Sequence, residues 1–309
     1  MNEENVEVVA DVPQAVAYES LRTDFFVTVL GSGAALPTFS RHCSAQVVSI
    51  RGYKLLIDCG EGTQGQIRAS HHRLQAFSVI CISHLHGDHF FGLPGLLSTM
   101  HLCGRTEPVT LIGPKGLKEA LTTMLHYAGC FLKYELIFRE LTMDECVVGS
   151  IEVFSNAQCK VSAFALRHSI ETFGYMIEEV PRNERPARRY AYCCDTGYFD
   201  ELTDIVRGVE LLCVESTFAD DFHAVAAEKQ HCTASQAALL AQKADVGRLL
   251  LTHFSNRYKD LEVLLNEARP IFPETLAALD CVRFGVEYKG RFLKSLAQYD
   301  AERLAGQKL

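Results

Sequence analysis

The segment from Ser83 to His89 constrains this chain more than any other, because it places three histidines and an aspartate within six consecutive positions. It follows Phe77 to Ile82, a short apolar run rich in β-branched residues that predicts a buried strand. Beyond the strand end, side chains two positions apart can converge on one point, and Gly87 lets the backbone carry Asp88 and His89 towards a second point. A metal site explains this density better than a polar loop does. Two metal ions a few ångström apart fit the spacing.

Length and composition predict a globular protein with a large core. The chain has 309 residues, of which 48% are hydrophobic and 22% charged, and we expect an N-terminal extension at residues 1–24 and a single α/β domain at residues 25–309. The formal net charge is -8, so the surface as a whole does not attract nucleic acid. A polyanionic substrate would need a local basic patch or the metal ions themselves.

The cysteines and the N-terminus bear on location. The 12 cysteines include no CxxC pair and are scattered over apparent strands, which is typical of small buried residues in a reducing compartment. The first residues lack the basic and apolar regions of a signal peptide, and no apolar run approaches membrane-spanning length. We therefore expect a cytoplasmic protein without a membrane segment.

Strand and helix patterns alternate along the chain and indicate stacked sheets faced by helices. A hairpin pattern ends at Asp58, which is either a turn former or a carboxylate that orients a ligand histidine. The segment 93–100 is expected to begin a helix, and further helices are expected at 114–127 and 258–269. Residues 231–235 are expected to head a helix that runs through Lys243, with Thr233 or Ser235 as its N-cap. Strands are expected at 25–30, 45–50, 54–57, 77–82, 109–112, 133–138, 151–154, 160–166, 173–177, 189–194, 209–214 and 248–252.

Three of these predicted strands end close to a residue that commonly binds metals, namely His168, Asp195 and His253. We therefore predict His84, His86 and His168 as ligands of one metal and Asp88, His89 and His253 as ligands of the other, with Asp195 bridging the two. Imidazole and carboxylate ligands favour zinc, with manganese or iron as rivals.

Two metal ions beside each other can acidify a water molecule and stabilise the attacking and leaving oxygens of a phosphodiester. The leaving alkoxide then needs a proton. His231, oriented by Glu215, is the candidate general acid, unless it only caps its helix. Asp88 could also steer the nucleophile.

Four arginines fall within the eight positions that end at Arg189. Such a run is either a solvated loop or a grip for phosphate groups. The predicted phosphate-binding residues are Arg182, Arg185, Arg188 and Arg189.

The residues around these sites resemble the ribonuclease Z family of the metallo-β-lactamase superfamily, endonucleases that remove 3′ trailers from precursor tRNA. The similarity covers the segments 58–64, 83–96, 113–116, 173–175, 215–218, 231–233 and 253–258. It implies a four-layer αββα sandwich, two zinc ions, a homodimer and cleavage that leaves a 3′-hydroxyl on the tRNA. It also implies that Glu215 and His231 assist catalysis and that Ser255 and Arg257, in the last matching segment, contact substrate.

One departure from the family pattern concerns the substrate. In ribonuclease Z a long arm that grips tRNA normally lies between the positions matching His168 and Asp195, but here that interval holds only 26 residues. Gly197 also stands where an arginine is common. Two hypotheses follow, a precursor-tRNA endonuclease with a shortened or relocated RNA grip and an arm-less phosphodiesterase of small or cyclic phosphodiesters. A catalytically silent nucleic-acid-binding protein is a third, which the intact ligand set disfavours.

Overall fold

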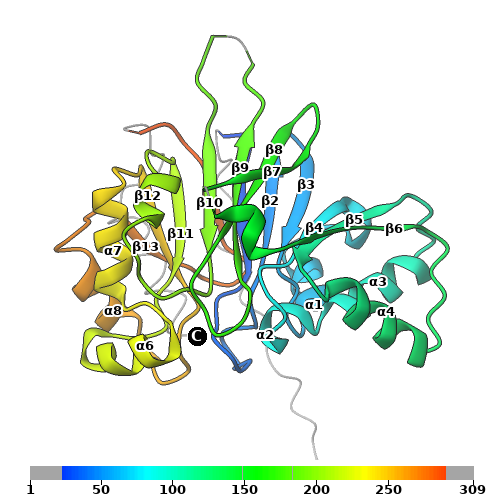
Figure 1. Ribbon diagram of the computed structural model, residues 1–309, viewed down its shortest axis with the longest axis horizontal. Coiled ribbons are helices and arrows are strands. Elements are labelled where there is room, and N and C mark those ends of the chain that lie inside the picture. The colour runs from blue at the N-terminus through cyan, green and yellow to red at the C-terminus, as the bar shows by residue number, and fades with distance from the viewer. Residues whose placement is uncertain (1–22, 148, 183, 290–309) are drawn as a thin grey trace, which may run out of the picture.

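The computed structural model describes residues 23–147, 149–182 and 184–289, and its centre is formed by two seven-stranded sheets packed face to face (Figure 1). Helices α1, α3 and α4 cover the outer face of the first sheet, and α7 and α8 cover the second. The predicted four-layer αββα sandwich is confirmed. Residues 1–22 of the predicted N-terminal extension lie outside the described residues, and the division at residue 24 stays a prediction.

The first sheet combines an antiparallel part with a parallel part. Strands β14, β1, β2 and β3 are antiparallel neighbours, and β3, β4, β5 and β6 run parallel. The bounds are β1 Phe25–Gly31, β2 Ala45–Ile50, β3 Tyr53–Ile57, β4 Phe77–Cys81, β5 Val109–Pro114, β6 Leu136–Leu141 and β14 Arg283–Gly285.

The second sheet has the same division. Strands β7 to β10 are antiparallel neighbours, and β10 to β13 run parallel. The bounds are β7 Ile151–Ser155, β8 Cys159–Ala165, β9 Phe173–Glu179, β10 Arg189–Cys193, β11 Leu211–Glu215, β12 Arg248–Thr252 and β13 Thr275–Ala277.

The helices are short. Their bounds are α1 Thr63–Ala69, α2 Gly87–Phe90, α3 Leu93–Leu102, α4 Leu117–Tyr127, α5 Leu202–Ile205, α6 His223–Lys229, α7 Ala234–Lys243 and α8 Glu262–Ala268, with 3-10 turns at Leu74–Ala76, Met143–Cys146 and Asp220–Phe222. Of the two predicted caps of α7, the structure selects Thr233, whose side chain accepts a hydrogen bond from the Gln236 backbone.

Three predicted elements begin three residues or more later in the structure. The strand predicted at 133–138 begins at Leu136, because its register with β5 starts there. The helix predicted from Pro114 begins at Leu117, since Pro114 still pairs with β6. The helix predicted from Tyr258 begins only at Glu262, because Tyr258 closes a turn on the Ser255 carbonyl.

The space between the sheets is apolar, with a few polar groups that pair with one another. Tyr175 and Tyr190 are fully buried there. The hydroxyl of Tyr175 donates to the Ile82 carbonyl at 2.7 Å, and that of Tyr190 donates to the Gln46 side chain. Most of the cysteines are buried, and none forms a disulfide, as expected. This paired core fixes the two sheets to each other, and with them the strand ends that carry the site.

Candidate metal centre

The ligand-type side chains leave their strands at one edge of the sandwich, the edge where α2 lies in Figure 1. Strands β8, β10, β11 and β12 all run in the same direction, so their carboxyl ends meet at this edge. The end of β4 reaches the same place, because the Phe173 N–H at the start of β9 donates to the Ser83 carbonyl. Two sheets and five connections thus contribute to one site.

A first group of donors consists of His84, His86, His168 and one oxygen of Asp195. His84 Nε2 and His168 Nε2 lie 3.0 and 3.3 Å from His86 Nδ1. The same two nitrogens lie 3.8 and 3.9 Å from Asp195 Oδ2. These separations suit ligands that share one ion at metal–ligand distances of about 2.0–2.2 Å.

A second group consists of Asp88, His89, His253 and the other oxygen of Asp195. His253 Nε2 lies 3.3 Å from His89 Nε2, 3.3 Å from Asp88 Oδ2 and 3.2 Å from Asp195 Oδ1. His89 Nε2 lies 3.5 Å from Asp195 Oδ1. The two oxygens of Asp195 therefore face different histidine groups, which is the arrangement of a bridging carboxylate.

The protonation states of these donors fit metal ions. Burial and the neighbouring His89 hold the pKa of His84 well below its usual value, so its ring is neutral and a nitrogen lone pair is available. Burial would raise the pKa of Asp195, but His253, His89 and His84 hold it well below its usual value. Burial would lower the pKa of His89, but the neighbouring Asp195, Asp58 and Asp88 outweigh it and raise the pKa well above its usual value. Buried, ionised carboxylates that attract positive charge among imidazoles suit a divalent metal site.

Beside the ligand groups lies the predicted pair of Glu215 and His231. The fully buried Glu215 carboxylate accepts a hydrogen bond from His231 Nδ1 at 2.6 Å and others from the Thr196 backbone and the Thr217 hydroxyl. Burial lowers the pKa of His231, but the nearby Glu215 outweighs it and raises the pKa to about 9. His231 is therefore protonated at neutral pH and lies close to Asp195 and His253.

Proteins similar to this chain share its fold, and several of them are named ribonuclease Z. A model of the beta-lactamase superfamily domain matches residues 53–254. Ribonuclease Z of Bacteroides thetaiotaomicron is 37% identical over 297 residues, covering 82% of this chain and 93% of that protein. Ribonuclease Z of Porphyromonas gingivalis is 35% identical over 302 residues, covering 84% of this chain and 98% of that protein.

The crystal structure of human tRNase Z, short form, is 32% identical and has a TM-score of 0.72, covering 85% of this chain and 99% of that chain. The chain belongs to the ribonuclease Z family. The resemblance seen in the motifs is thereby confirmed, and the chain is a metal-dependent hydrolase of the endoribonuclease type. Among the helices that the structure describes, none has the length and apolar character needed to cross a membrane.

Asp58 has both of the roles that the sequence left open, turn former and orienting carboxylate. Asp58 adopts a positive φ of 58° in the turn after β3. Its buried carboxylate accepts hydrogen bonds from the Ser83 backbone and from the Tyr192 hydroxyl, and it lies 2.7 Å from His89 Nδ1. This contact fixes the His89 ring so that Nε2 faces the second group.

Three further histidines of the donor groups in this ribonuclease Z family member have orienting partners that sequence reasoning missed. Ser83 Oγ lies 3.0 Å from His84 Nδ1, and Thr217 Oγ1 lies 2.9 Å from His253 Nδ1. The Gln230 carbonyl lies 3.2 Å from His168 Nδ1. Hydroxyls beside ligands in the sequence are too common to indicate this role, and a backbone carbonyl leaves no sequence signal.

Cys194 is another residue that the sequence did not single out. Its buried thiol donates to Asp195 Oδ1 at 2.7 Å and lies close to His89 and His253. The thiol therefore borders the second donor group, although the segment from Ser83 to His89 contains no cysteine.

The predicted substrate-binding residues fall in two places. Ser255 and Arg257 follow His253 at the site edge, where Arg257 Nε donates to Ser255 Oγ at 3.1 Å and the guanidinium lies 4.2 Å from the Phe222 ring. The other four arginines lie at the opposite edge of the sandwich, three in the β9–β10 connection and Arg189 at the start of β10 (Figure 1). They are therefore remote from the metal donors.

Two of those four arginines are engaged within the protein. Arg188 donates to Glu179 at 2.6 Å and to Asp24 at 2.7 Å, and its side chain is only 11% exposed. Arg189 donates to the Arg207 carbonyl at 3.1 Å. Arg182 and Arg185 are exposed. The proposed contact with phosphate groups is thereby narrowed to Arg182 and Arg185.

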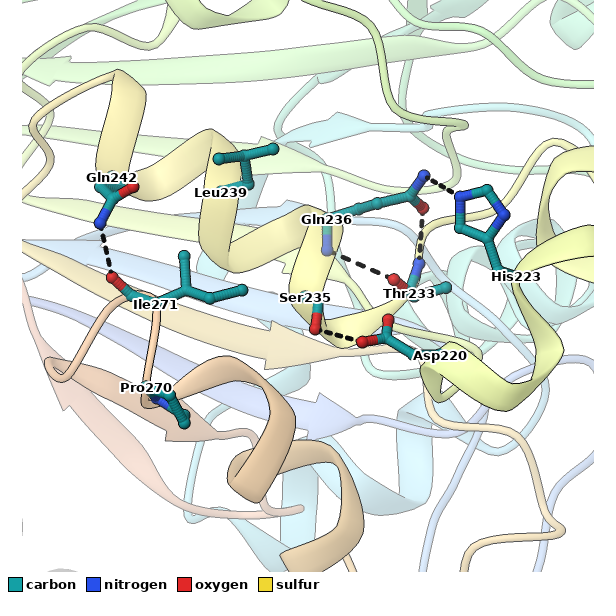
Figure 2. A pocket seen from close by; sticks show the side chains of 9 residues that line it. All are labelled: Asp220, His223, Thr233, Ser235, Gln236, Leu239, Gln242, Pro270 and Ile271. Atoms are coloured by element: carbon teal, nitrogen blue, oxygen red, sulfur yellow. Dashed lines mark hydrogen bonds between the residues drawn. The ribbon is translucent and has the colours of Figure 1, made fainter.

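A groove of about 620 Å³ lies outside the donor groups, against α7 (Figure 2). Its polar side chains largely pair with one another, as in the hydrogen bond from Ser235 to Asp220 and the contact of Gln236 with His223. Thr233 and Gln236 form the capping box of α7. The polar side chains of the groove at the start of α7 therefore have their partners within the protein.

We predict that Asp58→Asn lowers zinc affinity by about 10- to 100-fold, because the orienting carboxylate of His89 becomes a neutral amide. Competition titration with a chromophoric chelator measures this affinity. Asp144→Asn, in an exposed turn, is the control and should bind zinc like the wild type. An unchanged affinity in Asp58→Asn would show that the His89 ring needs no such partner.

Proposed function

We propose that this chain is a zinc-dependent endonuclease that removes the 3′ trailer from precursor tRNA. The observation that carries the proposal is the pair of donor groups sharing Asp195, next to the hydrogen-bonded Glu215 and His231. Relatives named Ribonuclease Z and the human tRNase Z structure support tRNA as the substrate. We further propose a homodimer located in the cytoplasm.

We propose two zinc ions, one held by His84, His86 and His168, the other by Asp88, His89 and His253, with Asp195 between them. Manganese or iron could replace zinc in such a set of nitrogen and oxygen donors. When bound, the two ions supply an acidified water molecule and neutralise charge on the phosphate.

The residues of the chain then carry out the proton transfers. Asp88 is placed to orient the attacking water, because the Ala35 N–H donates a hydrogen bond of 2.7 Å to Asp88 Oδ2 and fixes the carboxylate. As the bond between phosphorus and the 3′ oxygen breaks, His231 donates its proton to that oxygen, and Glu215 stabilises the charged ring. The products are a tRNA with a 3′-hydroxyl and a trailer that keeps the phosphate.

Contacts with RNA beyond the cleaved bond are also proposed. Ser255 and Arg257 lie at the site edge, where they can contact the nucleotides beside the cleaved bond. Arg182 and Arg185 are exposed at the far edge, where they can reach a more distant part of a large RNA.

One observation favours a second candidate function. The 26 residues between His168 and Asp195 leave no room for the long tRNA-gripping arm. An enzyme without this arm could instead hydrolyse small or cyclic phosphodiesters.

Incubation of the zinc-loaded protein with precursor tRNA and with bis-p-nitrophenyl phosphate separates the two functions. We expect a single cut directly after the discriminator nucleotide at low enzyme concentration, with loss of activity in chelator and recovery on adding zinc. Efficient hydrolysis of the small diester without any cut in precursor tRNA would contradict the proposal.

The role of His231 predicts a dependence on the leaving group. His231→Ala should lower kcat for precursor tRNA by about 10²- to 10⁴-fold, because the 3′ alkoxide needs a proton. The same variant should retain most activity on bis-p-nitrophenyl phosphate, since p-nitrophenolate leaves without protonation. Zinc content, measured by mass spectrometry, should not change. Equal losses on both substrates would assign His231 to a structural role.

A further inference from the structure

A cluster of basic side chains surrounds the end of α1, although the protein as a whole is acidic. Arg68 is exposed in the last turn of this helix, and His71 and Arg73 are exposed in the turn that follows it. The turn is held by the backbone, since the His71 N–H donates to Arg68 and the His72 N–H donates to Ile67. A net charge of -8 makes such a local concentration of positive charge notable.

The sheet beneath this turn adds two more basic residues. Thr28 of β1 is paired with Arg283 of β14, and Ser49 of β2 is paired with Lys54 of β3, on the outer face of the first sheet. Lys54 Nζ lies 3.0 Å from His72 Nδ1, and His72 Nε2 lies 3.1 Å from the Thr28 hydroxyl. His72 thus connects the Lys54 side chain to Thr28 of β1 and holds this side chain in place.

These groups repel one another. Partial burial lowers the pKa of Lys54, and Arg283 and Arg73 lower it further. Burial, Lys54 and Arg283 together lower the pKa of His72 to about 4, so His72 is neutral and accepts a hydrogen bond from Lys54. Nearby, the Ser49 hydroxyl is buried and has no hydrogen-bond partner within the described part of the chain. An anion over this face would relieve the repulsion.

The cluster lies within one short helix of the metal donors. The start of α1 is tied to the site, because the Thr63 hydroxyl donates to the Gly60 carbonyl and the Cys59 N–H donates to the His89 carbonyl. A helix of seven residues spans roughly 10 Å, so Arg68, in its last turn, lies somewhat less than that beyond the start of α1. Figure 1 shows α1 beside α2 at the site edge.

We infer that Lys54, Arg68, His71, Arg73 and Arg283, here called the α1 patch, bind the phosphate backbone of the RNA substrate at the end of α1 that lies away from the metal donors. This inference rests on the proposed function. Duplex RNA is recognised mostly through its phosphates and shape, which a fixed cluster of basic side chains can contact without reading sequence. The α1 patch thereby adds a second set of RNA contacts to those proposed for Arg182 and Arg185.

The test uses charge reversal at two exposed arginines of the patch. Arg68→Glu combined with Arg73→Glu should raise the Kd for precursor tRNA by about tenfold or more at low salt and reduce the slope of log K against log salt by roughly 1.5–2, two phosphate contacts being lost. Fluorescence anisotropy in chelator, where no cleavage occurs, gives both values. The matched control is Lys133→Glu with Lys160→Glu, which makes the same change in net charge at exposed positions elsewhere.

Hydrolysis of bis-p-nitrophenyl phosphate and zinc content should be unchanged in the Arg68 and Arg73 variant, which shows that the site is intact. An unchanged Kd and salt slope in this variant would overturn the α1 patch, and so would an equal loss in the control. If the wild type binds precursor tRNA through the patch but never cuts it, the proposed function fails while the patch stands. Tighter binding of an acidic protein than of precursor tRNA to the α1 patch would also overturn the inference.

Discussion

The metal centre depends on one buried carboxylate. Asp195 is only 3% exposed, and each of its oxygens faces a different set of imidazoles. Placing an ionised carboxylate in such a position costs several kcal/mol unless opposite charge compensates it. The surrounding ligand set is suited to hold that compensating charge as metal ions. The geometry of His84, His89, His168 and His253 is therefore organised around Asp195.

The scaffold supplies rigidity to this arrangement. Parallel strands end at one edge, and the histidines at their ends are oriented by Asp58, Ser83, Thr217 and the Gln230 carbonyl. Because these partners lie on the sheets or directly beside them, they hold the imidazole rings in fixed orientations. The pair of Glu215 and His231 is held in the same way, since a backbone donor and a hydroxyl donor fix the buried Glu215 carboxylate.

The sequence predicts well which side chains the fold brings together in the two donor groups, because metal-binding residue types in close spacing and at strand ends leave a clear signal. It predicts the layers too, since the strands are continuous apolar runs. It misses α1, a short helix whose Thr-Gln-Gly-Gln start has no apolar periodicity, and so it misses the basic cluster at the end of α1. It also treats Arg188 as a phosphate contact, although the folded chain surrounds it with Glu179 and Asp24. Long-range pairing of this kind cannot be read from local patterns.

The most direct test of the central claim is a crystal structure of the zinc-loaded protein with anomalous scattering measured at the zinc edge. The account predicts two peaks roughly 3.5–4 Å apart, one beside His84, His86 and His168 and the other beside Asp88, His89 and His253. Each peak should lie within bonding distance of a different oxygen of Asp195. A single peak, or two peaks with Asp195 bound to only one of them, would contradict the bridging role on which the site is built.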